Sequence, residues 1–430
     1  MMPLKEFGYR VFSTLYELVF KEKVSHEALN FFTGTSYVAI GTLFGGLLTF
    51  AWGVLAARTL GPSNFGNVGL VMSMGAILAI SMGPSHTGAV KYGSQAQDDS
   101  VRARIISTYT LQVEVLTVGS IAIYVLFFAQ LSNVFGISTE LYFFAVAYAA
   151  IATFFALTLN LLRILFRIRA YALLNALQSV VVLAAFLIFI STNVRSWQAT
   201  AFSVYIGDAA IVVILVVYLR RYIKLQFDQV WSKKILNYAV VALPGGIASA
   251  FMGVDKILIN KLITTAAVGI YTAYYLPSIT IALTLWGILG AAFFPYASKS
   301  RDRLSIFRSV NKAVPALTAA LLPLIILIEV VIFKLYGAQY PFSAELGLLF
   351  AFAATACFFY SCYSFLMAAE GTSGAKINAL SSIIALGVII GLNVVLLPLI
   401  GISGAAVALI FAYLAATVYL VSKWRILRAY

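Results

Sequence analysis

Five ionisable side chains stand inside long apolar stretches, where a charge is costly to bury and therefore marks a candidate functional site. Asp255 and Lys256 are neighbours, whereas Glu114, Asp208 and Glu329 stand alone. A lysine offers a point charge to a phosphate, and a carboxyl group can bind a cation or accept hydrogen bonds from sugar hydroxyls. The alternative is structural: Lys256 snorkels or neutralises a neighbouring acid, and each acid is protonated or paired.

The other reactive side chains give little support to metal or nucleophile chemistry. Cys357 and Cys362 lie in an apolar stretch without the paired Cys/His spacing of a zinc site. His26 and His86 have no second ligand nearby in the sequence. Neither a Ser/His/Asp arrangement nor a glycine-rich phosphate loop is recognisable. The sequence therefore predicts no metal, no cofactor and no enzymatic activity.

The elements that carry the ionisable residues are predicted to be membrane-spanning helices. The 430 residues are 62% hydrophobic and 10% charged, whereas soluble proteins are about 45–50% apolar and 25% charged. Apolar stretches of about 20 residues, the length that crosses a bilayer, recur along the chain. We expect an all-α polytopic membrane protein with twelve helices, at about residues 35–58, 65–83, 104–130, 140–163, 170–191, 196–219, 236–261, 267–296, 312–334, 342–368, 375–397 and 402–422.

The basic residues predict the orientation of these helices. A net charge of +14 would raise the question of nucleic acid in a soluble protein. If both termini are cytoplasmic, however, all but five of the 29 Lys and Arg residues fall on the inner side, as the positive-inside rule requires. We expect a multi-pass protein of the cytoplasmic (inner) membrane, in contact with the lipid bilayer and with no nucleic-acid partner. The five outer residues are Arg58, Arg195, Lys256, Lys261 and Lys334.

An internal repeat divides the chain into two halves. A shift of 203 residues aligns ALLNALQSVVVL, from Ala172, with AKINALSSIIAL, from Ala375, and also places Phe65-Gly66 on Val268-Gly269. Each repeat contains an even number of spans, so the two halves enter the membrane in the same direction. We expect two six-helix bundles at 35–219 and 236–422, a cytoplasmic linker at 220–235 and a cytoplasmic tail at 423–430.

Residues 1–34 precede the first expected span. Leu4, Phe7, Val11 and Leu15 follow helical spacing, and charged residues interrupt the segment, unlike a cleaved signal peptide. This pattern predicts an amphipathic helix in the membrane interface. A solvated cytoplasmic helix is the alternative.

Four segments resemble a known group of membrane proteins. They are AARTLGPSNFG at 56–66, DKILINKLITTAAVGIYTAYY at 255–275, FPYAS at 294–298 and NVVLLPLIGISGAA at 393–406. Together they resemble the Wzx-type oligosaccharide flippases of the multidrug/oligosaccharidyl-lipid/polysaccharide (MOP) exporter superfamily. The resemblance implies a MATE-like fold of two bundles. It also implies export of a polyprenyl-(pyro)phosphate-linked oligosaccharide by alternating access, with polysaccharide-assembly enzymes as further partners.

One departure narrows the expected substrate. The peptidoglycan-precursor branch of the superfamily carries an Arg-Asp pair in its first helix, where this sequence has Trp52-Gly53. We therefore expect a precursor of a surface polysaccharide rather than lipid II.

A sugar-phosphate substrate predicts where cations should line the passage. Lys256, next to Asp255, is the first candidate for a phosphate contact. Weaker candidates lie at the two mouths of the passage: Arg58 and Lys261 on the outer side, and Arg163, Arg167 and Arg169 on the inner side, where the arginines could instead serve only to set the topology.

The segment Pro244, Gly245 and Gly246 should weaken the seventh helix, because proline removes a backbone hydrogen bond. A hinge there would change the opening of the passage. The alternative is a kink without a gating role.

Two other functions remain open from the sequence. A cation-coupled multidrug exporter of the same superfamily would use acids in its lumen, for which Glu114, Asp208 and Glu329 are the candidates. A membrane glycan polymerase or ligase would be expected to carry a large extracytoplasmic loop, whereas the connections predicted here are short.

Overall fold

The fold is entirely helical over the part of the chain that the structure describes. The structure, a computed structural model, describes residues 26–220, 226–287, 303–368 and 371–424. Ten helices in these ranges are long and apolar enough to cross a membrane, or eleven if one bent pair counts as a span. This confirms an all-α polytopic membrane protein, and the count of twelve remains a prediction. The segment FPYAS and most of the expected interfacial helix lie outside the described residues.

The first half begins with one helix that contains two expected spans. α2 (His26–Met82) has 57 residues and would be about 85 Å long if straight, far more than one bilayer crossing needs. Gly61 breaks it, with φ 71° and ψ 172°, and Pro62 follows. The remaining helices are α3 (His86–Gln95), α4 (Asp99–Leu126), α5 (Phe128–Phe135), α6 (Thr139–Ile164), α7 (Ile168–Ser191) and α8 (Trp197–Leu219).

The segment expected to be the seventh span, at the start of the second half, is broken into three pieces. These are α9 (Gln229–Ala250), the 3-10 turn η1 (Phe251–Gly253) and α10 (Val254–Leu262). The helix axis bends by 54° between Gln229–Val240 and Leu243–Leu262. Pro244 has no N–H to bond the carbonyl of Val240, which explains the position of the bend. The remaining elements are α11 (Thr265–Tyr275), the π-helix η2 (Leu276–Thr280), α13 (Arg303–Tyr336), α14 (Ala344–Ala368), α15 (Gly371–Ile400) and α16 (Ile402–Ser422).

Side-chain caps begin several helices at one end of the molecule. Ser138, Ser196 and Thr264 accept hydrogen bonds from the backbone N–H three residues further on, at the starts of α6, α8 and α11. These caps satisfy N–H groups that a helix start leaves unpaired. Capping allows short connections between spans that run in opposite directions.

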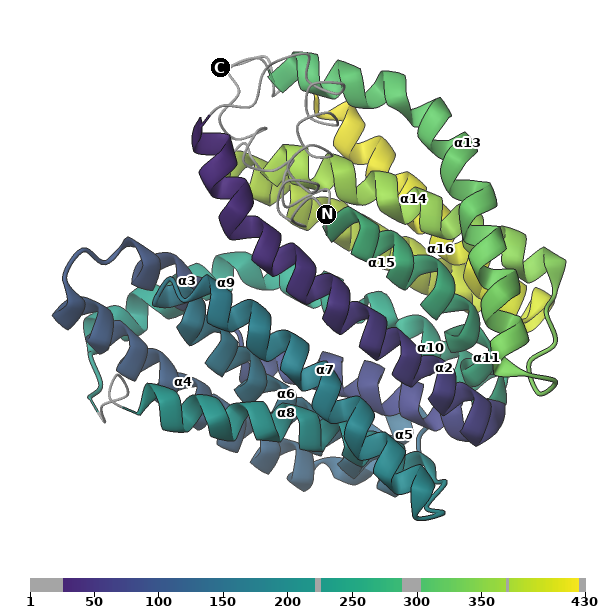
Figure 1. Cartoon of the computed structure of the whole chain (residues 1–430), viewed down its shortest axis with the longest axis horizontal. Coiled ribbons are helices and arrows are strands. Elements are labelled where there is room, and N and C mark those ends of the chain that lie inside the picture. Colours follow the sequence, from purple (N-terminus) through teal and green to yellow (C-terminus); the bar gives the residue numbers. More distant parts are fainter. Residues whose placement is uncertain (1–25, 221–225, 288–302, 369–370, 425–430) are drawn as a thin grey trace, which may run out of the picture.

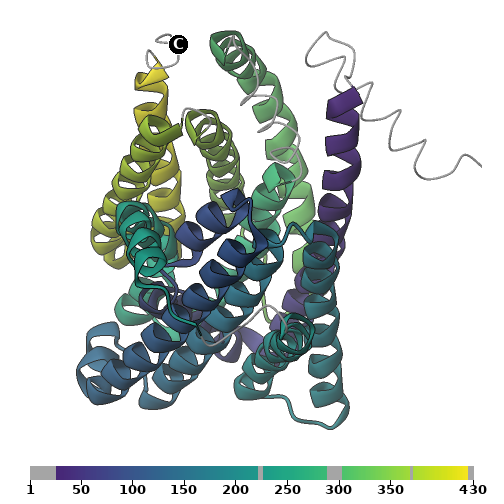
Figure 2. The ribbon, with the colours of Figure 1, turned by 90° about the vertical axis from the view of Figure 1, so that its left-hand side faces the viewer.

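The helices form two groups that follow the sequence. In Figure 1 the blue and teal helices of the first half lie below the green and yellow helices of the second half, with α2 along the boundary between them. The view from the α3 side in Figure 2 shows the same two groups. We call the end of the molecule that carries α3 the α3 end, and the opposite end, which carries α5 and Gly61, the α5 end.

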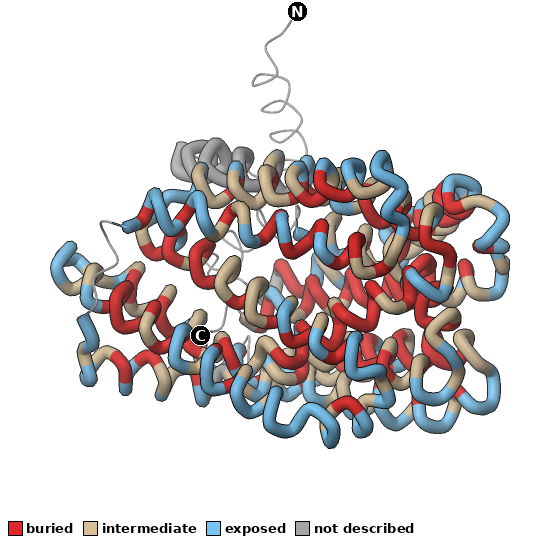
Figure 3. Tube along the Cα trace, turned by 90° about the horizontal axis from the view of Figure 1, so that it is seen from below, coloured by how far each residue is buried: buried red, intermediate tan, exposed pale blue. Residues whose placement is uncertain are grey.

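Apolar side chains cover the outside of the molecule as well as its core. Figure 3 shows exposed residues along the periphery. The exposed large apolar side chains of the described residues include Leu47, Val115, Leu173 and Leu399. Exposed apolar surface over whole helices suits contact with lipid chains.

Candidate functional site

Two glycines bring the halves into backbone contact at the α5 end. A Cβ built on Gly66 of α2 would lie 2.0 Å from the carbonyl oxygen of Thr265 in α11. A Cβ built on Gly269 of α11 would lie 1.9 Å from the carbonyl oxygen of Pro62 in α2. Such separations are far inside van der Waals contact, so any larger residue would force the two helices apart.

The two contacts mirror each other. The shift of 203 residues maps Pro62 onto Thr265 and Gly66 onto Gly269, so the contact from Gly66 to Thr265 becomes the contact from Gly269 to Pro62. This reciprocity is what a two-fold relation between repeats produces.

We call the surface on which α2 and α3 meet α9, α10 and α11 the seam. At the α5 end the seam is closed.

Hydrogen bonds add to this closure. Asn260 Nδ2 donates to the carbonyl oxygen of Gly136 at 3.0 Å, and Lys261 Nζ donates to that of Val134 at 3.1 Å. Both bonds join α10 of the second half to the end of α5 in the first half. Lys261 was a predicted phosphate contact, and in this arrangement it holds the two halves together. Arg58 is exposed at the same end.

Asp255 and Lys256 lie further along the seam and have different partners. Asp255 is fully buried in the first turn of α10; Tyr271 Oη donates to its Oδ2, and the backbone N–H of Lys256 donates to its Oδ1 at 2.7 Å. The Lys256 ammonium instead lies 5.2 Å from the ring centroid of Tyr275. Within the described ranges no carboxylate oxygen lies within 4.0 Å of Lys256 Nζ. The carboxylate is therefore hydrogen-bonded to a phenol. In the described ranges the ammonium makes no ion pair within 4.0 Å, but the neighbouring Asp255 charge still attracts it.

The stem of Lys256 crosses from one half to the other. A methyl group on Gly69 of α2 would meet Lys256 Cδ at 3.9 Å, and one on Gly253 would meet Ser73 Oγ at 3.5 Å. Lys256 is half-buried. The sequence-predicted pair Asp255 and Lys256 thus lies between the halves, where a passage would run.

A cavity lies at the α3 end, between α2, α6 and α9. It has a volume of about 300 Å³. Its walls are mostly small and apolar, in contrast to the hydrated, partly cationic passage that the sequence led us to expect. His86, Thr87 and Thr153 are its polar members. The small residues that leave the space open include Ala76 and Ala79 of α2, Ala152 and Ala156 of α6, and Ala239 and Gly246 of α9.

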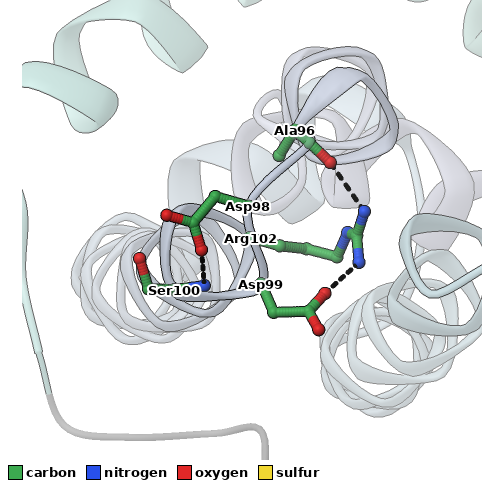
Figure 4. A network of polar contacts seen from close by, with 5 residues as sticks. All are labelled: Ala96, Asp98, Asp99, Ser100 and Arg102. Atoms are coloured by element: carbon green, nitrogen blue, oxygen red, sulfur yellow. Dashed lines mark hydrogen bonds and ion pairs between the residues drawn. The ribbon is translucent and has the colours of Figure 1, made fainter.

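Polar contacts fix α3 beside this cavity. Arg102 donates to the carbonyl oxygen of Ala96 at 2.6 Å and to Asp99 Oδ1 at 2.5 Å, while Asp98 Oδ1 accepts from the backbone N–H of Ser100 at 2.7 Å (Figure 4). The bond from Arg102 to Ala96 ties the end of α3 to α4, and the other two stabilise the start of α4.

His86, at the start of α3, is packed tightly and uncharged. Its Nδ1 lies 2.6 Å from Tyr109 Oη, and a methyl group on Gly83 would come within 2.5 Å of its Nε2. Burial lowers the pKa of the imidazole from 6.5 to about 4. A cationic His86 would lose solvation that nothing beside it replaces.

The three isolated acids lie apart from each other and from Lys256. Asp208 is buried within the first half, where Gln178 Nε2 donates to its Oδ1 at 2.8 Å. Glu329 is fully buried in α13, and neither carboxyl oxygen has a hydrogen-bond partner among the described residues. Glu114 is exposed on α4. The structure does not bring them together into one binding site.

The predicted arginines of the inner mouth are at the α3 end. Arg163, Arg167 and Arg169 are exposed, and Arg163 donates to Asn160 Oδ1 at 3.2 Å. Among the described residues, no cluster of His, Cys, Asp and Glu side chains could hold a metal ion.

Sequence reasoning missed Lys91. The Lys91 ammonium lies 4.1 Å from the ring centroid of Tyr238 in α9, which joins the two halves at the α3 end. The positive-inside count treated Lys91 only as one inner charge among many. Its spacing of four residues from Thr87 could have placed both on one face of a helix.

Comparison with known families agrees with this architecture. The sequence profile described as "Polysaccharide biosynthesis protein" matches residues 31–301, more than half of the chain. The chain belongs to the polysaccharide biosynthesis protein family. No curated protein sequence matches it.

Solved structures of MOP-superfamily proteins share the fold of this family member. An inward-facing multidrug resistance MATE transporter has a TM-score of 0.70 at 16% identity, covering 91% of this chain and 99% of its own. An outward-facing MATE transporter scores 0.61 at 15% identity, with coverage of 95% and 100%. The lipid II flippase MurJ, in an inward closed conformation, scores 0.68 at 14% identity, with coverage of 90% and 87%. The predicted resemblance to the MOP superfamily is confirmed.

The glycine contact predicts that Gly66→Ala opens the seam at the α5 end. The added methyl group meets main chain that cannot move aside, at a cost of about 1–3 kcal/mol. Thr272, which is buried against Gly69, is a suitable reporter position. In a Thr272→Cys background, labelling by a water-soluble maleimide should rise about tenfold with Gly66→Ala.

Gly119→Ala is the control for this experiment, because a Cβ there meets nothing within 4 Å. The native thiols of Cys357 and Cys362 are buried, so background labelling should be low. Equal labelling of the Gly66→Ala and Gly119→Ala proteins would show that the glycine contact does not hold the seam closed.

The environment of His86 predicts a loss of stability in mild acid. The unfolded chain binds a proton on His86 below about pH 6.5, and the folded chain only below about pH 4. Between these values protonation favours the unfolded state, by up to about 2 kcal/mol at pH 5. The thermal unfolding midpoint in detergent should fall between pH 7 and pH 5, and fall less for His86→Gln. Identical pH profiles of the two proteins would contradict this assignment.

Proposed function

We propose that this protein moves a polyprenyl-(pyro)phosphate-linked oligosaccharide from the cytoplasmic to the outer leaflet, for the synthesis of a surface polysaccharide. The family and the MOP fold support transport of such a precursor. The observation that carries the proposal is Lys256. Its ammonium lies in the seam between the halves and, among the described residues, has no carboxylate oxygen within 4.0 Å, although the adjacent Asp255 attracts it.

The physical problem of such transport is the polar headgroup. Each sugar hydroxyl that loses water without a new partner costs about 4–8 kcal/mol on a hydrocarbon reference. The phosphate adds a full charge, for which a lysine is a suitable partner because it binds as a point charge without demanding one geometry. Lys256 supplies this charge, and Tyr275 beneath it offers a ring face and a hydroxyl.

Alternating access follows from the unequal ends of the seam. By the positive-inside rule, the α5 end faces outward and the α3 end faces the cytoplasm, with both termini on the cytoplasmic side. The glycine contact closes the outer end, and the cavity lies toward the inner end. The TM-scores against the inward-facing transporter and the inward closed flippase, 0.70 and 0.68, exceed the 0.61 against the outward-facing transporter, which supports an inward-facing state.

The seventh span is suited to act as the hinge of this motion. Its beginning is fastened to the first half, because Gln112 Nε2 donates to Ser232 Oγ at 2.7 Å. Beyond the bend, Gly245 packs on Ala379 of the second half. Pro244, Gly245 and Gly246 thus lie between a part attached to the first half and a part that packs on the second half, although α10 at its far end also bonds to α5 where the seam is closed. Rocking of the halves would change the bend at these residues.

The arrangement of acids does not favour a multidrug exporter. A cationic drug needs carboxylates that face a common passage. Asp208 and Glu329 are buried in different halves, and none of the three isolated acids lines the cavity. The position of Lys256 in the seam favours an anionic substrate.

Replacement of Lys256 by glutamine tests the proposal. The purified protein is reconstituted in liposomes with a defined lipid-linked oligosaccharide, and its movement between leaflets is measured. Lys256→Gln should slow movement about tenfold or more, since a hydrogen bond to a charged group contributes about 1.5–3 kcal/mol.

Lys334→Gln is the matched control, because Lys334 is an exposed lysine near the α5 end but outside the seam. Its transport rate should equal that of the unchanged protein. Full activity of Lys256→Gln would remove Lys256 from the substrate path. Absence of movement by the unchanged protein would overturn the proposed function itself.

A further inference from the structure

A second unpaired lysine lies beside the α3-end cavity. Thr87 lines the cavity, and Lys91 lies one turn further on the same face of α3. The Lys91 ammonium is 4.1 Å from the ring centroid of Tyr238 and 5.5 Å from that of Tyr92. Tyr238 directly precedes Ala239, which belongs to the cavity wall. Lys91 does not line the cavity itself but lies one helical turn beyond its wall residue Thr87.

The charge of Lys91 is held in place but not neutralised. Lys91 is half-buried, and no carboxylate oxygen in the described segments lies within 4.0 Å of its Nζ. The tyrosine rings attract the ammonium through their faces, which orients it without removing its charge. α3 is also held against α9, because a methyl group on Gly88 would come within 2.6 Å of the Ile235 carbonyl oxygen. The site is thus built before any ligand arrives.

The chemistry of the cavity defines the ligand. A volume of about 300 Å³ is at the lower limit of small-molecule sites. Apart from His86, Thr87 and Thr153, the side chains of the walls offer no hydrogen bonds to a sugar, whereas a hydrocarbon chain gains about 0.8 kcal/mol for each buried methylene group. The cation at the edge needs an anionic group next to that chain. A lipid phosphate combines both features in one molecule.

We propose that Lys91 and the α3-end cavity bind the phosphate and the adjoining isoprenoid units of a polyprenyl phosphate carrier. The choice of this carrier over other anionic lipids rests on the proposed function. The site lies on the predicted cytoplasmic side, so the carrier would contact Lys91 before Lys256. Each lysine lies over a tyrosine, Tyr238 at one end of the seam and Tyr275 toward the other. The phosphate would be passed between two cations of the same kind.

Direct binding tests the site without transport. Geranylgeranyl phosphate is titrated into the purified full chain in detergent, and the dissociation constant is measured by calorimetry. Lys91→Gln should weaken binding about tenfold or more. Lys234→Gln is the matched control, because Lys234 also lies over an aromatic ring, that of Trp231 at 4.5 Å, but is exposed. The control should bind as tightly as the unchanged protein.

Filling the cavity tests the part that holds the hydrocarbon chain. Ala156→Leu should weaken binding of geranylgeranyl phosphate about tenfold or more by occupying the space of the chain. Gly119→Leu adds a side chain where nothing lies within 4 Å and should have no effect. Thermal unfolding of each variant shows whether it is folded. If Ala156→Leu is not folded, Lys91→Gln still tests the site, because it leaves the cavity walls intact.

Three further ligands define the recognised chemistry. Geranylgeraniol lacks the phosphate, and inorganic phosphate lacks the hydrocarbon chain. Both should bind at least tenfold more weakly than geranylgeranyl phosphate. Phosphatidylglycerol, whose acyl chains differ from the isoprenoid chain of the carrier, should also bind at least tenfold more weakly. Equal binding of the alcohol or of phosphatidylglycerol, or unchanged binding by Lys91→Gln, would overturn the proposal. Carrier binding by a protein that moves no lipid-linked oligosaccharide would support this site and reject the flippase function. Transport of the lipid-linked oligosaccharide without binding of geranylgeranyl phosphate would support the flippase function and reject this site.

Discussion

A hydrocarbon environment permits no unpaired backbone group, and this constraint governs the whole structure. Regular helices satisfy their own N–H and C=O groups, so nearly all of the described chain is helical. Irregular backbone is tolerated only where protein or an internal cavity surrounds it. Two breaks of the described second half follow this rule, because η1 ends two residues before Asp255 and η2 directly follows Tyr275. These two irregular turns therefore flank the residues around Lys256.

The sequence could predict features that depend on local chemistry. Apolar length predicted the all-α membrane fold class, and proline chemistry predicted the bend near Pro244. The adjacency of Asp255 and Lys256 inside an apolar stretch marked two candidates that the structure places in the seam. The 203-residue shift marked Gly66 and Gly269 as equivalent.

Features that depend on how the halves pack could not be predicted in this way. Equivalence of Gly66 and Gly269 does not reveal that both meet the opposite main chain. The helices that carry Glu114 and Asp208 are apolar on nearly every face, so periodicity did not distinguish the exposed Glu114 from the buried Asp208. Lys91 was not recognised as a candidate because the positive-inside rule counts every cytoplasmic Lys and Arg equally. Its particular role depends on Tyr238, which the fold brings from the other half.

The contact of the two glycines constrains how this sequence can diverge. The atoms opposite Gly66 and Gly269 belong to the main chain, so no smaller residue across the interface can make room for a new side chain. Compensating substitutions, which commonly rescue a tightly packed core, have no target here. Both positions should therefore accept little sequence drift in descendants of this protein, although neither is proposed to touch the cargo. If both glycines are invariant among related sequences, the reason would be the close contact that shuts the seam, and not the choice of substrate.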